Sequence, residues 1–253
     1  MVRYPARALL VLVALTGACS TQDEGTTATA DDDIKGGHAD TTHPAVVALL
    51  PRDASFPSGL CTGTIFKVDA ARGVGWVLSA AHCATPDVAL QGDDVLAPDV
   101  RRYPVVGSSR HPRYEANAHT YDFAVHRIRG VDATTPTMAL TTAPDGIASG
   151  ALVTAIGYGV EDERMWPSSV RRAVQRPVSY TTDFLIVYHA NDGGGSCFGD
   201  SGGPLVEGFG DTERVVGVFS TVFDSKCSSM VGNGRVALAI DFIESATQEV
   251  TTP

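Results

Sequence analysis

Short apolar runs, each ended within a few residues by Gly, Pro or Asp, constrain the fold of this chain more than any other feature. Their length and their Val, Ile and Ala content are typical of β-strands. The runs are 45–50, 63–68, 75–79, 122–128, 151–156, 184–188, 204–207 and 215–220. A helical spacing of apolar residues occurs only at 236–250, at Val236, Ile240 and Ile243. Many short strands with one closing helix favour an all-β chain that folds into β-barrels.

The charge of the chain limits its partners. The formal net charge is −10 and no basic stripe is present, which argues against a general nucleic-acid-binding function. The basic pair Arg171–Arg172 is short, and we expect both side chains on a solvated surface. Asp40 lies in a polar stretch, so we expect no special partner for its carboxylate.

The first residues have the features of an export signal. Arg3 and Arg7 precede an apolar run at 8–15 that is too short to span a bilayer as a stable anchor. Residues 15–20 resemble a bacterial lipoprotein signal, in which Cys19 carries a lipid. The alternative is ordinary signal cleavage and release. We therefore predict a signal peptide at 1–19 and an exported bacterial protein, either a cell-envelope lipoprotein or a secreted one.

Residues 20–33 are rich in Thr, Asp and Ala and lack large apolar side chains, so we expect a disordered linker or propeptide there. The remaining chain of about 220 residues is long enough for one large or two small cores. Apart from Cys19 it has four cysteines, which in an exported protein imply two disulfides with three possible pairings. No closely spaced Cys and His residues suggest zinc.

A serine loop and two distant side chains suggest nucleophilic catalysis. Ser201 lies in the small, flexible sequence 197–204, which can expose one hydroxyl and direct two backbone N–H groups to one point. Serine is a weak nucleophile unless a base accepts its proton. His82 follows an apolar strand-like run, and Asp122 begins another. A carboxylate in such a run needs a partner, because an unpaired buried charge is costly.

These motifs, in the order His82, Asp122, Ser201, resemble the trypsin/chymotrypsin-like serine peptidases. The resembling segments cover 34 to about 245, and they are 34–37, 61–65, 76–83, 111–114, 157–159 and 199–204. The resemblance implies a bacterial, exported member with a peptidase domain at 34–253. It implies two antiparallel six-stranded β-barrels, at about 34–130 and 145–235, and a C-terminal helix at about 236–250. The catalytic groups would lie between the barrels.

The resemblance also implies residue roles. His82 accepts the proton of Ser201, and Asp122 orients the imidazole. The N–H groups of Gly199 and Ser201 form an oxyanion hole. The implied substrate-binding residues are Gly195, Ser196, Phe198, Ser220, Thr221 and Val222. The implied disulfides are Cys61–Cys83 and Cys197–Cys227.

Activation and specificity depart from the family pattern. The resemblance implies a zymogen in which Asp200 pairs with a freed amine of Ile34. Asp33 precedes Ile34 and Lys35 follows it, so the activating protease is unknown. Gly195 replaces the acid of trypsin-like pockets, which argues against Arg or Lys preference. A β-branched Val222 would narrow the pocket, so we predict small or medium apolar substrate side chains.

We predict a serine endopeptidase that acts on protein or peptide substrates through an acyl-enzyme, with no cofactor, no metal and no nucleic acid. Its membrane contact would come only through Cys19. One alternative is a catalytically silent or latent member that serves as a protein-binding module. Others are a structural lipoprotein and an acyl hydrolase that does not cleave peptides.

Overall fold

The structure is a computed structural model, and it describes residues 34, 37–51, 56–160, 166–190 and 194–248. All of them belong to the unit Asp31–Pro253. The predictions for the signal peptide, the linker and Cys19 lie outside the described residues. Within the described ranges, no helix is long and apolar enough to cross a membrane.

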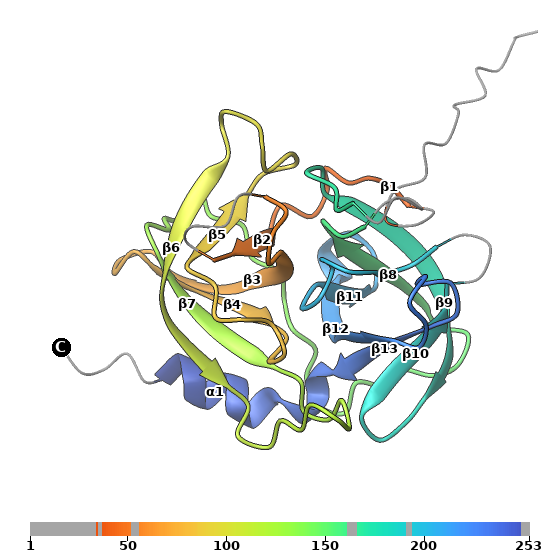
Figure 1. Ribbon diagram of the computed structural model, residues 1–253. Helices are drawn as coiled ribbons and strands as arrows, with labels where there is room; N and C mark the ends of the chain where they lie inside the picture. The colour runs from red at the N-terminus through yellow and green to blue at the C-terminus, as the bar shows by residue number, and fades with distance from the viewer. Residues whose placement is uncertain (1–33, 35–36, 52–55, 161–165, 191–193, 249–253) are drawn as a thin grey trace, which may run out of the picture. The chain divides into compact units, whose positions relative to one another are not determined.

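The first half of the described chain forms a closed antiparallel barrel of six strands (Figure 1). In barrel order they are β2 (Val46–Leu50), β3 (Cys61–Asp69), β4 (Val74–Ser79), β7 (Ala124–Arg129), β6 (Arg101–Arg110) and β5 (Val88–Gln91). Side chains alternate along β4. Val77 packs with Ile65 and Ile128 in one apolar cluster, whereas Trp76 and Leu78 belong to another. The barrel therefore has an apolar outer face as well as a filled interior.

The second half closes in the same way around another apolar cluster. Its strands, in sheet order, are β9 (Arg172–Thr181), β10 (Leu185–His189), β13 (Met230–Arg235), β12 (Arg214–Val222), β11 (Pro204–Glu207) and β8 (Leu152–Gly157), and β8 pairs with β9. The short strand β1 (His38–Ala39) joins the edge of β9. The prediction of two six-stranded β-barrels is confirmed.

The described part of the chain ends in a short helix, α1 (Ile240–Gln248), in blue in Figure 1. It begins later than the apolar spacing at 236–250 indicated, because Val236–Leu238 form a 3-10 turn that ends at Ala239. Ile243 of α1 is buried in the cluster that contains Val46 of the first barrel and Val206 of the second. This shared cluster joins the two barrels. A second 3-10 turn, η1 (Gly210–Thr212), precedes β12.

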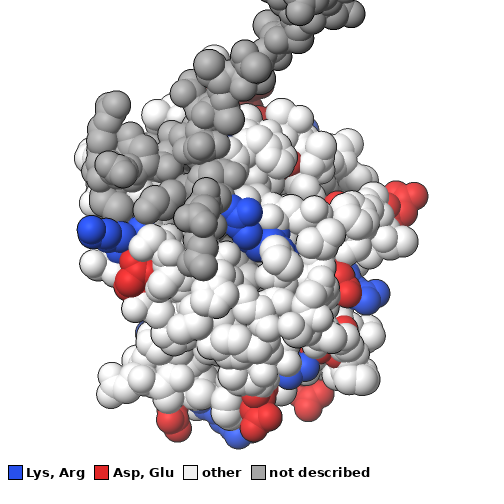
Figure 2. Space-filling view, turned by 90° about the vertical axis from the view of Figure 1, so that its right-hand side faces the viewer, with Lys and Arg blue, Asp and Glu red and all other residues white. Residues whose placement is uncertain are grey.

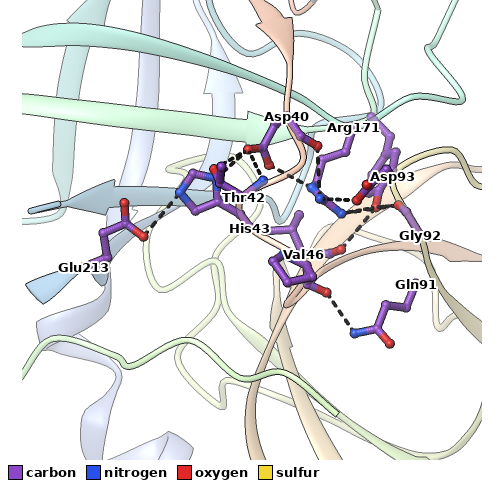
Figure 3. A network of polar contacts seen from close by, with 11 residues as sticks. Asp40, Thr42, His43, Val46, Gln91, Gly92, Asp93, Arg171 and Glu213 are labelled. Atoms are coloured by element: carbon purple, nitrogen blue, oxygen red, sulfur yellow. Dashed lines mark hydrogen bonds and ion pairs between the residues drawn. The ribbon is translucent and has the colours of Figure 1, made fainter. Parts of the chain in front are cut away.

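A buried ionic network fastens the start of the described chain (Figure 3). The guanidinium of Arg171 is fully buried and contacts Asp40 at 2.8 Å and Asp93 at 2.7 Å. It also donates to the backbone oxygens of Asp40 and Gly92. The expectation that Arg171 and Arg172 lie on a solvated surface is wrong, since both are buried. Their partners come from segments far away in the sequence, which a local composition cannot reveal.

Asp40 is the centre of this network and is also buried, contrary to the sequence-based expectation. Burial raises the pKa of its carboxyl, but hydrogen bonds from His43, Arg171 and Thr42 outweigh burial and hold the pKa well below its usual range. His43 joins Asp40 at 2.8 Å to Glu213 at 3.4 Å. Burial lowers the pKa of His43, but the bonds to these carboxylates raise it above its ordinary value.

Candidate active site

His82 and Asp122 make a two-point contact. His82 follows β4, and the Cys61–Cys83 disulfide ties its loop to β3. The His82 Nδ1 lies 2.7 Å from Asp122 Oδ2, and the His82 backbone N–H donates to Asp122 Oδ1 at 2.9 Å. Asp122 is 1% exposed and the His82 side chain 31%. Since Nδ1 faces the carboxylate, Nε2 is the ring nitrogen left to meet a nucleophile.

Asp122 is held from both barrels. It precedes β7 of the first barrel, and the hydroxyl of Ser220, on β12 of the second, donates to its Oδ2 at 2.5 Å. Burial raises the pKa of the Asp122 carboxyl, but the bonds from His82 and Ser220 outweigh burial and lower it. The acid therefore stays ionised at neutral pH, and it has the partners that its apolar neighbours required.

The loop of Ser201 packs against the strands that lead to His82. The Thr62 N–H donates to the Ser201 carbonyl at 2.8 Å, and the Gly202 N–H donates to the Phe219 carbonyl at 2.9 Å. A Cβ added at Gly202 would lie 2.0 Å from Ser79 Oγ, so only glycine permits this approach. Among the described residues, none forms a hydrogen bond with the Ser201 hydroxyl. Such bonds are commonly long in substrate-free enzymes.

Two backbone donors next to Ser201 are unoccupied. Neither the Gly199 N–H nor the Ser201 N–H donates to any group within the part of the chain that the structure describes. Gly199 has a φ of 96°, and a Cβ there would lie 3.0 Å from the backbone of Gly159. The Gly199 carbonyl turns away and accepts from Thr62 Oγ1 at 2.9 Å. The turn thus leaves two N–H groups available to an incoming oxyanion.

Asp200 is a buried carboxyl that lacks a positive partner. It is 1% exposed and accepts the N–H groups of Gly159 at 2.7 Å and Cys197 at 2.8 Å. No basic side chain within the described ranges contacts it. Burial raises its pKa to about 7, and the two backbone bonds offset this only in part. A Cβ at Gly157 or Gly159 would lie 2.1 or 2.3 Å from its oxygens, which explains the 157–159 glycine motif.

Ile34, the expected activation residue, is fully buried in the apolar cluster of the second barrel, with Val153 and Tyr188. Its neighbours Asp33 and Lys35 lie outside the described residues. The side chain therefore occupies the core on the same barrel that carries Asp200. Cys197, three residues before Asp200, forms the second disulfide with Cys227.

The trypsin family model matches residues 34–241. The chain belongs to the trypsin family. Trypsin I-P1 of Gallus gallus is 28% identical over 220 residues, which cover 78% of this chain and 82% of the relative. Brachyurin of Leptuca pugilator is 28% identical over 180 residues, 64% of this chain and 75% of the relative. These relatives come from animals, so they lend no support to a bacterial source.

Solved structures show the same fold at lower identity. HBP has a TM-score of 0.72 at 19% identity, covering 87% of this chain and 97% of that chain. Human heparin binding protein has a TM-score of 0.70 at 19% identity, covering 83% and 95%. At this identity the likeness concerns the fold.

In the region where the family resemblance places the substrate pocket of this trypsin-family chain, two valines lie on paired strands. Val222 of β12 lies directly opposite Val231 of β13 in the strand register. Val231 is fully buried and Val222 is half-buried. The sequence left this segment, 228–234, ambiguous, because two glycines and a short polar loop obscure the strand. Paired positions of adjacent strands place both β-branched side chains side by side on the same face of the sheet.

The base of the same region is tightly packed. A Cβ added at Gly195 would lie 2.9 Å from the ring of Tyr188. The Tyr188 hydroxyl accepts the Ser196 N–H at 2.9 Å and donates to Ser196 Oγ at 3.0 Å. Burial raises the pKa of Tyr188 to about 12, so the phenol stays neutral. Phe198 is 49% exposed, and its carbonyl accepts the N–H of Val160 at 2.8 Å.

Thr221 continues β12 beyond Ser220 and is half-buried, with its hydroxyl donating to the Val222 carbonyl at 3.3 Å. Among the described residues, no group of three or more His, Cys, Asp or Glu side chains could hold a metal ion. The candidate active site itself brings together an oriented imidazole, a hydroxyl and two unoccupied backbone donors.

Proposed function

We propose that this protein is a serine endopeptidase of the trypsin family in which His82, Asp122 and Ser201 form the catalytic triad. The observation that carries the proposal is the double contact of Asp122 with His82, beside a serine loop with two unoccupied N–H groups. Membership of the family supports protein or peptide substrates.

The reaction uses these groups in sequence. The Ser201 oxygen attacks the peptide carbonyl carbon while His82 Nε2 takes the hydroxyl proton. The electron pair of the carbonyl moves to its oxygen, which the Gly199 and Ser201 N–H groups stabilise. Collapse of this intermediate expels the amine, which receives the proton from His82, and leaves an acyl-serine. Water then attacks the acyl carbonyl carbon while His82 takes a proton from it, and the bond to Ser201 breaks as the serine oxygen recovers that proton. Asp122 stabilises the imidazolium each time it forms.

We further propose that the chain is a zymogen. A new amine at Ile34 would supply the positive partner that Asp200 lacks, and burial of the Ile34 side chain on the same barrel supports this pairing. The activating protease stays unidentified, because Asp33 and Lys35 fit no common activation sequence. Export and lipidation at Cys19 stay predictions from the leader, as does the bacterial source.

For specificity, we propose small or medium apolar side chains. Val222 and Val231 lie side by side on paired strands, and neither Gly195 nor Ser196 supplies a charge for a basic substrate. A third feature agrees with this choice, because Tyr188 closes the space behind Gly195 with a neutral ring.

The test is labelling with an organophosphorus serine probe, followed by intact mass and peptide mapping. Two forms are compared: the purified full chain, and the chain cut to begin at Ile34 through an engineered cleavage sequence in place of 30–33. We expect one adduct at Ser201 in the cut form, little in the full chain, and none in Ser201→Ala. A folded cut form that takes no label would refute the proposal that this protein is a serine endopeptidase.

A binding module is the second candidate, because two solved structures with this fold carry names that state heparin binding. The net charge of −10 opposes binding of a polyanion. On the face in Figure 2, Lys and Arg side chains lie scattered among acidic ones. Binding without labelling at Ser201 would favour this candidate.

A further inference from the structure

A pocket of about 190 Å³, separate from the candidate active site, lies on the outer face of the first barrel. Strand β4 contributes Trp76, strand β7 contributes Val125 and Arg127, strand β6 contributes Ser109, and helix α1 contributes Ala246. Trp76 and Val125 belong to the apolar cluster that Ile243 of α1 also joins. None of the lining residues belongs to the candidate active site or to the ionic network of Arg171.

The cation in this pocket has no acidic partner. Arg127 lies opposite Trp76 on one side and opposite Gly107 on the other in the strand register. No carboxylate among the described residues contacts its guanidinium. This is notable in a chain with 29 acidic and 19 basic side chains. Gly107 leaves room beside it, since even an added Cβ would lie 3.5 Å from Arg127 Nη2.

Trp76, which lines the pocket, also carries an unused donor. The Nε1 of Trp76 is buried and has no hydrogen-bond partner within the described residues. Buried polar groups normally have one. Lys67 holds its ammonium 5.1 Å from the centre of the Trp76 ring, which adds positive charge nearby. The lining contains no acidic side chain, so it offers donors, positive charge and apolar walls.

We propose that this pocket binds a small organic carboxylate. Arg127 would hold the carboxylate, because its planar fork matches two carboxylate oxygens. The hydrocarbon part would lie against Val125, Ala246 and the Trp76 ring. The volume suits such a ligand, since one water molecule occupies about 30 Å³ of liquid. A free small acid and the C-terminal carboxylate of a peptide share this chemistry.

Fluorescence titration tests the proposal in a Trp166→Phe background. The chain has two tryptophans, and Trp166 is 64% exposed and outside the pocket, so Trp76 becomes the sole reporter. Hexanoate should give a saturable change, and hexanamide, its neutral analogue, should give none. Ser201→Ala in the same background prevents cleavage of peptides. Short peptides with a free or an amidated C-terminus then identify the source of the carboxylate.

Arg127→Gln should raise the dissociation constant for hexanoate about tenfold or more, because it removes a charged donor. Arg129→Gln makes the same change at the exposed end of β7 and should leave the constant unaltered. Arg127→Lys should retain part of the affinity for hexanoate. If Arg127→Gln does not fold, the dissociation constant of Arg127→Lys tests the role of Arg127. Calorimetry repeats each titration independently of fluorescence.

Three results would overturn the proposal: no saturable binding of hexanoate or of free-carboxylate peptides by either method, equal binding of hexanamide, or equal constants for Arg127→Gln and Arg129→Gln. Stronger binding of inorganic phosphate than of hexanoate would also overturn it. Labelling of Ser201 does not enter these readouts, so the result stands apart from the proposed peptidase activity.

Discussion

The hydroxyl of Ser220 reaches Asp122 from the other barrel and donates a hydrogen bond of 2.5 Å to the oxygen that also contacts His82. Asp122 thus has hydrogen-bond partners in both barrels. The hydroxyl of Ser220 is thus a positioning group for the acid of the candidate triad.

Removal of this bond should weaken catalysis most at low pH. Ser220→Ala takes away one interaction that lowers the Asp122 pKa, so the acidic limb of the profile of kcat/KM should move to higher pH. We expect a loss of about tenfold at neutral pH. Ser149→Ala, which removes an exposed hydroxyl that donates to the Ser179 carbonyl at 2.8 Å, is the matched control. An unmoved limb would show that Ser220 is merely structural.

Gly159→Ala should disable the site through Asp200. The added Cβ would lie 2.3 Å from Asp200 Oδ2 and must displace the carboxyl or its loop. We expect at least about a hundredfold loss of labelling at Ser201, the scale of losing one oxyanion donor. Gly146→Ala is the control, because its Cβ meets no atom within 4 Å and it introduces only backbone strain at φ 67°. Equal labelling of both variants would contradict this.

The facing valines should set substrate size. Val222→Gly with Val231→Gly removes two branched side chains from adjacent strands, so peptides with Phe before the scissile bond should gain relative to those with Ala. We expect the ratio of kcat/KM values to shift about tenfold or more toward Phe. The measurement is competition between matched peptides. An unchanged ratio would place the determinant elsewhere in the pocket.

Acid should destabilise the chain through His126. This ring is buried and bonds Ser108, while its Nε2 has no partner among the described residues. Burial lowers its pKa to about 4, so between pH 6.5 and 4 the unfolded chain binds a proton that the folded chain does not. The stability that His126 contributes above pH 6.5 is lost as the pH falls through this window, by about 3 kcal/mol.

Urea unfolding of Ser201→Ala with and without His126→Asn measures this difference. The unfolding free energy of the parent relative to the variant should fall as the pH drops from 7 to 4. The opposite effect of Asp200, whose raised pKa of about 7 removes stability as the pH rises, is present in both chains and cancels. If the unfolding free energies of the two chains changed in parallel with pH, the lowered pKa of His126 would be contradicted.

Arg171 should be the most costly charge to remove. Arg171→Met leaves Asp40 buried without its main cation, and breaking a buried pair costs about 3–5 kcal/mol. Arg101→Met breaks an exposed contact of 4.0 Å to Asp132 and should cost under about 1 kcal/mol. Urea unfolding compares the two. Similar losses of unfolding free energy in the two variants would mean that burial does not make the ion pairs of Arg171 more costly to break.

The sequence predicts those strands whose own residues carry an apolar run. Eight such runs correspond to β2, β3, β4, β7, β8, β10, β11 and β12. Strands β1, β5, β6, β9 and β13 were missed. In β6 only Tyr103 is buried, and the other residues are wholly or partly exposed, so no apolar pattern marks the strand. Its pairing with β5 and β7 holds it in place, and pairing between distant segments is invisible to a local reading.

The functional residues also differ in how far the sequence could predict them. His82, Asp122 and Ser201 were found because each lies in a distinctive local motif. Val231 and Arg171 were not, because their roles depend on a strand register and on ion pairs with remote residues. Local motifs thus led to the proposed reacting groups, whereas the strand register and the ion pairs depend on tertiary contacts.

The ionic anchor at Asp40 has a kinetic consequence for activation. Asp40 lies six positions after Ile34, so a new terminus there could move no more than about 20 Å from the anchor. So short a tether keeps a freed amine at a high effective concentration near its own barrel, in the millimolar range or above. In the activation that we propose, docking of the amine onto Asp200 would be a local search, whose rate would be independent of protein concentration.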